Sequence, residues 1–173
     1  VNPIRVCTSK TSFKLHMAHK SNLDYIKRNR IDFDYFVMEA SNSLYVKEGA
    51  ENYIAKYDVG LGFYRINGYW GKKVLEPKSL FEYYRLEMKT DYADIMKGCH
   101  EGGFFSKDIV DEFFYYINEL DSFCIKQNDP PLYPTEEIWF QLIARLLLNN
   151  KKNLKVGNTV TYLPWERNLE WTR

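Results

Sequence analysis

The sequence predicts an α/β layered domain, because short apolar runs typical of strands alternate with segments that have helical periodicity. Two helices stand out, one beginning at Ser106 and one at Thr135, and one continuous apolar run, Tyr35–Met38, is typical of a strand covered on both faces. With 173 residues, the chain has the length of a single domain, which we place over residues 1–173.

The first half of the chain contains one clear helix and one clear strand. Residues Lys10–Arg30 carry apolar side chains at helical spacing and end in a basic turn, which suits the helix dipole. Residues Phe33–Ala40 form the strand, and a short helix is expected within Glu48–Tyr57. Residues Tyr57–Lys73 are rich in glycine and aromatic side chains, so we expect a hairpin or a loop there.

The second half is dominated by the two strong helices. After the mixed segment Ser79–Gly98, the helix beginning at Ser106 has six inward positions: Ile109, Val110, Phe113, Phe114, Ile117 and Leu120. The helix that Thr135 opens also has six: Ile138, Trp139, Leu142, Ile143, Leu146 and Leu147. Partial alternation over Leu154–Leu163 indicates a strand or hairpin.

Composition excludes several functions. Lys and Arg number 24 against 23 Asp and Glu, a net charge of +1, so nucleic acid is not an expected partner. No apolar run reaches the ~18 residues of a transmembrane helix, and no signal peptide is visible. These features favour a cytoplasmic location, or the Golgi lumen if the chain is part of a longer, membrane-anchored protein.

Cysteine and histidine spacing predicts no metal site. The three cysteines, Cys7, Cys99 and Cys124, are far apart and form no CxxC pair, so we expect reduced thiols rather than a disulfide framework or zinc centre. His16 and His19 are three residues apart on a predicted helix and can meet on one face, but no cysteine joins them.

Two loops are candidate binding sites. In an open α/β sheet, ligands bind beyond the carboxyl ends of strands, which is where Ser41, Asn42 and Ser43 fall; a plain turn of small polar residues fits equally well. The segment Glu101, Gly102 and Gly103 precedes a helix, so its backbone can approach a ligand closely. A flexible loop before a capped helix is the simpler interpretation.

Glu136 and Glu137 occupy the first turn of a predicted helix, where the helix dipole stabilises carboxylates as anions. A general base must be ionised before it accepts a proton, so this position suits catalysis. Helix electrostatics alone also explains glutamates there.

Three segments, in order, resemble the core-2/I-branching type glycosyltransferases. They are FDYFVMEASNSLYVK at residues 33–47, GGFFSK at residues 102–107 and YPTEEIW at residues 133–139. The resemblance implies a GT-A-like layered domain with a mostly parallel central sheet flanked by helices. It also implies inverting transfer of a sugar from a nucleotide-diphosphate donor, expected to be UDP-linked, to a glycan hydroxyl.

The same resemblance assigns roles to residues. Glu136 corresponds to the family's catalytic base, and Glu137 is expected to point elsewhere. The family uses no metal or other cofactor, and basic side chains neutralise the diphosphate; Lys47 and Arg167 are the candidates here. Ser43, Tyr45 and Thr135 depart from the family pattern. The alternative is a non-catalytic carbohydrate- or protein-binding domain of the same fold.

Overall fold

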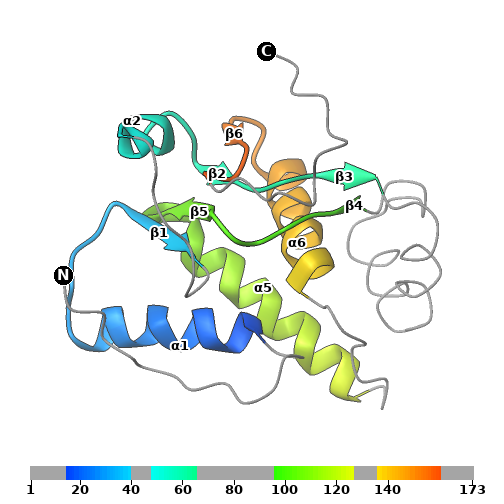
Figure 1. Cartoon of the computed structure of the whole chain (residues 1–173). Coiled ribbons are helices and arrows are strands. Elements are labelled where there is room, and N and C mark those ends of the chain that lie inside the picture. The colour runs from blue at the N-terminus through cyan, green and yellow to red at the C-terminus, as the bar shows by residue number, and fades with distance from the viewer. Residues whose placement is uncertain (1–14, 40–47, 66–95, 127–135, 161–173) are drawn as a thin grey trace.

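The computed structural model describes residues 15–39, 48–65, 96–126 and 136–160, and Figure 1 shows the arrangement of their helices and strands. A four-stranded sheet has the order β1-β5-β2-β6. Its strands are β1 (Tyr35–Met38), β5 (Gly103–Ser106), β2 (Val59–Gly60) and β6 (Val156–Gly157). Strands β3 (Tyr64–Arg65) and β4 (Met96–Lys97) form a separate antiparallel pair.

The predicted α/β class is confirmed, but the sheet is mixed rather than mostly parallel. Strand β5 runs antiparallel to both of its neighbours, β1 and β2, and only β2 and β6 are parallel. Helices between strands favour parallel crossovers, yet the chain here reaches β5 through β3 and β4, which are antiparallel to each other. Within the described sheet, β1 is therefore an edge strand next to β5, not a central one.

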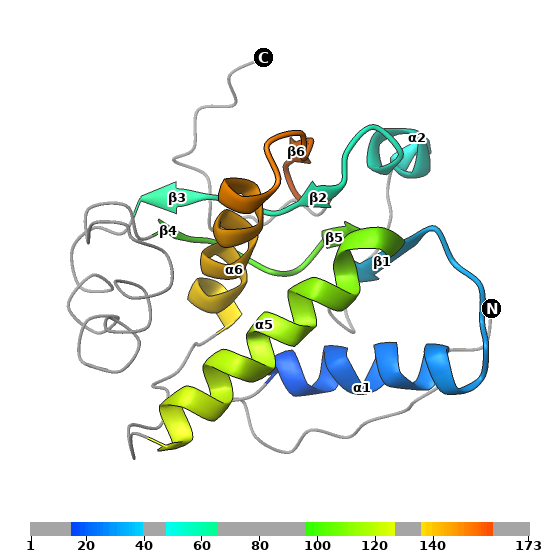
Figure 2. The same cartoon turned by 180° about the vertical axis from the view of Figure 1, so that it is seen from behind.

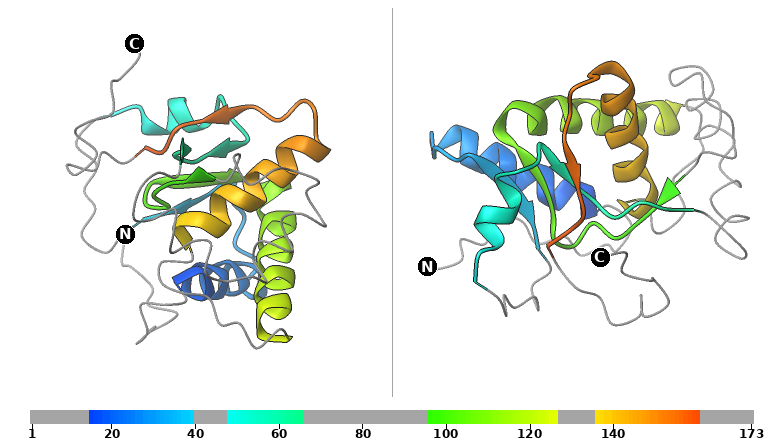
Figure 3. Two further views of the ribbon diagram at one scale, coloured as in Figure 1. Left: turned by 90° about the vertical axis from the view of Figure 1, so that its right-hand side faces the viewer. Right: turned by 90° about the horizontal axis from the view of Figure 1, so that it is seen from above.

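Helices cover both faces of this sheet. Helices α1 (Leu15–Arg28), α5 (Lys107–Lys126) and α6 (Glu136–Asn150) contribute to one apolar core with Phe36, Met38 and Phe105. On the opposite face, the buried ring of Phe104 contacts the rings of Tyr35 and of Tyr53 from helix α2 (Ala50–Ile54). Figure 3 shows α2 and the other three helices on opposite sides of the strands.

Helix α5 follows the sequence pattern closely. It begins one residue after Ser106, and all six side chains expected to face inward are buried. Phe113 is fully buried, and the centre of its ring lies 4.0 Å from that of Phe105 on the sheet. The 3.6-residue period of apolar positions therefore determined both the helix and the face that it buries.

Helix α6 is more enclosed than its pattern predicts. The six predicted positions are buried, but so are Phe140, Gln141 and Ala144. The ring of Trp139 meets that of His16 from α1, whereas Gln141 donates a hydrogen bond from Nε2 to the carbonyl oxygen of Gly62. Helix α6 thus packs against α5 and β4, and Figure 2 shows it between α5 and the β3–β4 pair.

The remaining predicted elements are shorter than expected or lie outside the described residues. The first helix spans Leu15–Arg28 within the predicted Lys10–Arg30. Of the predicted strand at 154–163, residues 154–160 are described, and only Val156–Gly157 form a strand, β6. Residues 1–14 and 66–95 are outside the description. No described helix has the length and hydropathy needed to cross a membrane.

Candidate functional site

The turn from Gly98 to Gly103 lies where β1 ends and α6 begins. Gly103 is opposite Met38, the last residue of β1, and the amide of Gly102 donates to the Met38 carbonyl at 2.6 Å. The amide of Gly98 donates to the carbonyl of Glu137 in the first turn of α6 at 2.8 Å. Backbone hydrogen bonds thus bring together parts of all three segments that carry the family resemblance.

Glycine is required at two positions of this turn. A Cβ on Gly98 would lie 1.9 Å from the carbonyl oxygen of Gly62, which real Cβ atoms essentially never do. Gly102 has a φ of 71°, a left-handed conformation that side chains other than glycine rarely adopt. The amide of Gly103 closes the turn onto the carbonyl of His100 at 2.9 Å.

The structure describes only some of the residues predicted to form the site. Glu101, Gly102 and Gly103 lie in the turn, and Glu136 is the first residue of α6, at the position expected for it. The description does not extend to the side chain of Glu136. The other predicted site residues, Ser41, Asn42, Ser43, Lys47 and Arg167, lie outside the described residues, as does Thr135.

Glu137 lies on the side of α6 that faces the turn. It is partly buried, and its negative charge is among the causes that raise the pKa of the Cys99 thiol. The expectation that Glu137 points away from the catalytic position stays a prediction, because the side chain of Glu136 is outside the described residues. The hydrogen bond from the Gly98 amide to the Glu137 carbonyl places the 98–101 segment beside this turn of the helix.

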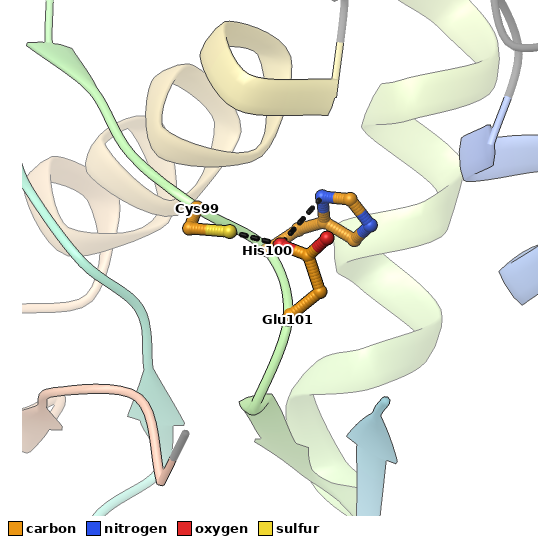
Figure 4. A group of neighbouring side chains, drawn as sticks. All are labelled: Cys99, His100 and Glu101. Carbon is orange, nitrogen blue, oxygen red and sulfur yellow. Dashed lines mark hydrogen bonds and ion pairs between the residues drawn. The ribbon is translucent and has the colours of Figure 1, made fainter. Parts of the chain in front are cut away.

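Three consecutive side chains of the turn form a compact polar cluster, Cys99, His100 and Glu101 (Figure 4). The Cys99 thiol donates a hydrogen bond to Oε2 of Glu101, and Nδ1 of His100 lies 3.9 Å from the same oxygen. Burial is the main cause that raises the pKa of Cys99, and the hydrogen bond from its thiol to Glu101 adds to it. Cys99 is therefore a thiol, not a thiolate, at neutral pH.

Two histidines of α1 complete the surroundings of this cluster. The ring centre of His19 lies 5.4 Å from that of His100, edge to face, and the buried ring of His16 lies on Trp139. Burial, together with His100 and His16, lowers the pKa of His19 to about 3. Burial also lowers the pKa of His100, although the charge of Glu101 opposes this shift. The imidazoles of His19 and His100 are therefore neutral at pH 7.

Sequence reasoning missed the Cys99 cluster because it treated cysteines and histidines as separate sets. The adjacent letters Cys-His-Glu were visible in the sequence, but three consecutive residues normally point in different directions. Only the tight turn between Gly98 and Gly103 brings their polar atoms to within 4.8 Å of one another.

Comparison with known proteins found two similar bacterial enzymes. The chain is 33% identical over 162 residues to a chondroitin synthase of Pasteurella multocida (strain Pm70), a match that covers 90% of this chain. It is 33% identical over 177 aligned positions to a hyaluronan synthase of Pasteurella multocida, covering 99% of the chain. The chain spans only 16% and 18%, respectively, of the lengths of these relatives. No family model and no solved structure matches.

Proposed function

We propose that this chain is a glycosyltransferase domain with a GT-A-like fold that takes part in polysaccharide synthesis. In this proposal it transfers a sugar from a UDP-linked donor to a hydroxyl of a glycan acceptor, with inversion at the anomeric carbon. Its similarity over nearly its whole length to two polysaccharide synthases supports the reaction class. The observation that carries the site is the meeting of the β1 end, the Gly98–Gly103 turn and the first turn of α6.

The chemistry of inverting transfer gives Glu136 its proposed role. The acceptor hydroxyl attacks the anomeric carbon, its proton passes to a base, and the bond to the diphosphate oxygen breaks on the opposite face. Glu136 is the first residue of α6, where the helix dipole favours the carboxylate form that can accept this proton. Glu101, Gly102 and Gly103 are proposed to border the substrate, with Ser41, Asn42 and Ser43 following β1.

The leaving diphosphate needs positive charge, and we assign this role to Lys47 and Arg167. Their charge would stabilise the diphosphate in the transition state without a divalent cation. Transfer by the protein should therefore persist in excess EDTA, and Lys47→Met or Arg167→Met should lower kcat/KM. Strict dependence of transfer on manganese would contradict this assignment.

The central test compares two adjacent glutamates. Glu136→Gln keeps the size of the side chain but removes the base, so the rate of sugar transfer should fall ~10²–10⁴-fold. Glu137→Gln is the matched control on the same helical turn, and transfer should decrease far less. Thermal unfolding of both variants measures folding separately. Equal losses of activity in the two variants would reject Glu136 as the base.

A non-catalytic carbohydrate- or protein-binding domain is the second candidate, and one observation favours it. The chain spans less than a fifth of each synthase, which leaves most of their length to carry the transfer reaction. A panel of nucleotide sugars and glycan oligosaccharides in a thermal-shift assay separates the two. A ligand at ~100 times its Kd stabilises the folded protein by about 2.7 kcal/mol, which raises its unfolding temperature. A domain whose unfolding temperature rises with oligosaccharides but with no nucleotide sugar is a binding module.

A further inference from the structure

We propose that Cys99, His100 and Glu101 form a binding site for a zinc ion, through Sγ, Nδ1 and a carboxylate oxygen. This inference does not rest on the proposed glycosyl transfer, although Glu101 is also proposed to border the substrate. In the described part of the chain, these three ligand atoms all lie within 4.8 Å of one another, and Figure 4 shows them converging from one turn. The proposal revises the expectation from sequence spacing that the chain has no metal centre.

The distance between His100 and Glu101 is close to the separation of two ligands of one zinc ion. Zinc lies ~2.0–2.3 Å from its sulfur, nitrogen and oxygen ligands, so tetrahedral geometry separates two ligand atoms by about 3.3–3.8 Å. His100 Nδ1 and Glu101 Oε2 are 3.9 Å apart, too long for a hydrogen bond but suited to a shared ion. The Cys99 thiol instead donates its proton to Oε2 of Glu101, so binding of the ion would require these two atoms to move apart as the thiol proton leaves.

A second and independent observation is the state of His100. Its side chain is 6% exposed, and Nδ1 has no hydrogen-bond partner among the described residues. A buried polar atom without a partner costs free energy, of the order of 1–3 kcal/mol. Edge contacts with the rings of His19 and Phe140 hold the imidazole so that this nitrogen is on the Glu101 side. A zinc ion between His100 and Glu101 would give Nδ1 the partner that it lacks.

The donor set selects the metal. Thiolate and imidazole are ligands that zinc prefers, whereas magnesium and calcium take oxygen ligands almost exclusively. Binding forms a Zn–S bond as the thiol proton leaves to solvent, with no change of oxidation state. The negative charge of Glu137, close enough to act on Cys99, also favours a cation at this position. Three protein ligands leave a fourth coordination position for water or an exogenous group.

The experiment titrates the 173-residue protein with zinc chloride in competition with a chromophoric chelator, and separately with cobalt(II) followed by absorption. We expect one tight zinc equivalent, visible cobalt bands of tetrahedral type and a near-ultraviolet thiolate-to-cobalt band. Cys99→Ser should abolish the thiolate band and weaken zinc binding by at least ~10–100-fold, the loss caused even by removing an outer-shell partner. His100→Ala should weaken binding to a similar extent.

Cys124→Ser is the matched control, because it removes a buried thiol of α5 outside the cluster. It should leave zinc affinity and the cobalt spectrum unchanged, and circular dichroism checks that every variant folds. Wild-type protein without a thiolate-to-cobalt band would overturn the proposal, as would equal zinc affinities for wild type and Cys99→Ser. The cobalt spectrum of the wild-type protein decides the matter even if a variant does not fold. Because no turnover is measured, the outcome does not depend on the glycosyltransferase proposal.

Discussion

Replacing Gly98 with alanine tests the packing that positions the candidate site. The new Cβ would lie 1.9 Å from the Gly62 carbonyl oxygen and 2.6 Å from Nε2 of Gln141. Ordinary van der Waals contact begins at 3.4 Å, so the methyl group or the backbone must move by about 1.5 Å. The obstacle is a backbone carbonyl rather than the end of a flexible side chain, and the strain cannot be relieved by a rotamer change.

The expected loss of stability follows from two costs and one gain. Overpacking of a buried position costs ~1–3 kcal/mol. Displacing Gln141 breaks its 3.2 Å hydrogen bond to Gly62 and leaves a buried amide unsatisfied, at ~1–3 kcal/mol. Alanine also restricts the conformations of the unfolded chain, which raises the free energy of unfolding by ~0.4–1 kcal/mol. We therefore expect Gly98→Ala to lower the free energy of unfolding by about 3 kcal/mol.

Urea unfolding followed by tryptophan fluorescence measures this loss, since Trp139 is buried in the same helix as Gln141. The midpoint should fall with little change in the m value. Gly49→Ala is the matched control: its Cβ would meet only Asn52 Nδ2 at 3.8 Å, so the cost is that of a left-handed φ of 89°, ~1–2 kcal/mol. A Gly98→Ala variant as stable as Gly49→Ala would refute the argument from close packing.

Two further predictions concern the core and the histidines. Phe113→Ala should lower the free energy of unfolding by ~3–5 kcal/mol, because its fully buried ring packs against the rings of Phe105 and Phe140. Tyr115 lies on the same helix and is 58% exposed, so Tyr115→Ala should change the free energy of unfolding by less than ~1 kcal/mol. Urea titrations measure both values. For His19, whose pKa falls from 6.5 to about 3 on folding, the unfolded chain binds the proton first as pH is lowered, so stability should be lost from pH 6.5 towards 3. This loss of unfolding free energy is at most ~1.4 kcal/mol per pH unit. His19→Leu should reduce the dependence of unfolding free energy on pH, measured by urea titrations at successive pH values. The same pH dependence in the variant would contradict a lowered pKa for His19.

Local pattern determined the elements of this protein. The apolar period of α5 and α6 predicted both helices to within one residue at their starts, and the continuous run Tyr35–Met38 is β1. These predictions succeed because helical and strand periodicities are properties of neighbouring residues. For the site, the sequence likewise predicted that Glu136 lies in the first turn of a helix. The expectation that Glu101–Gly103 leads directly into a helix was wrong, because strand β5 (Gly103–Ser106), which pairs with β1 and β2, lies before α5.

Relations between distant segments were decided only by the tertiary structure. Strand direction depends on the path of the whole connection, so the antiparallel placement of β5 did not follow from alternating helices and strands. The burial of Gln141 depends on the Gly62 carbonyl, 79 residues away in sequence. The cluster of Cys99, His100 and Glu101 exists because Gly98 and Gly102 fold their backbone against α6 and β1. A linear pattern records which donors are present, but the directions of their side chains depend on backbone dihedrals set by long-range packing.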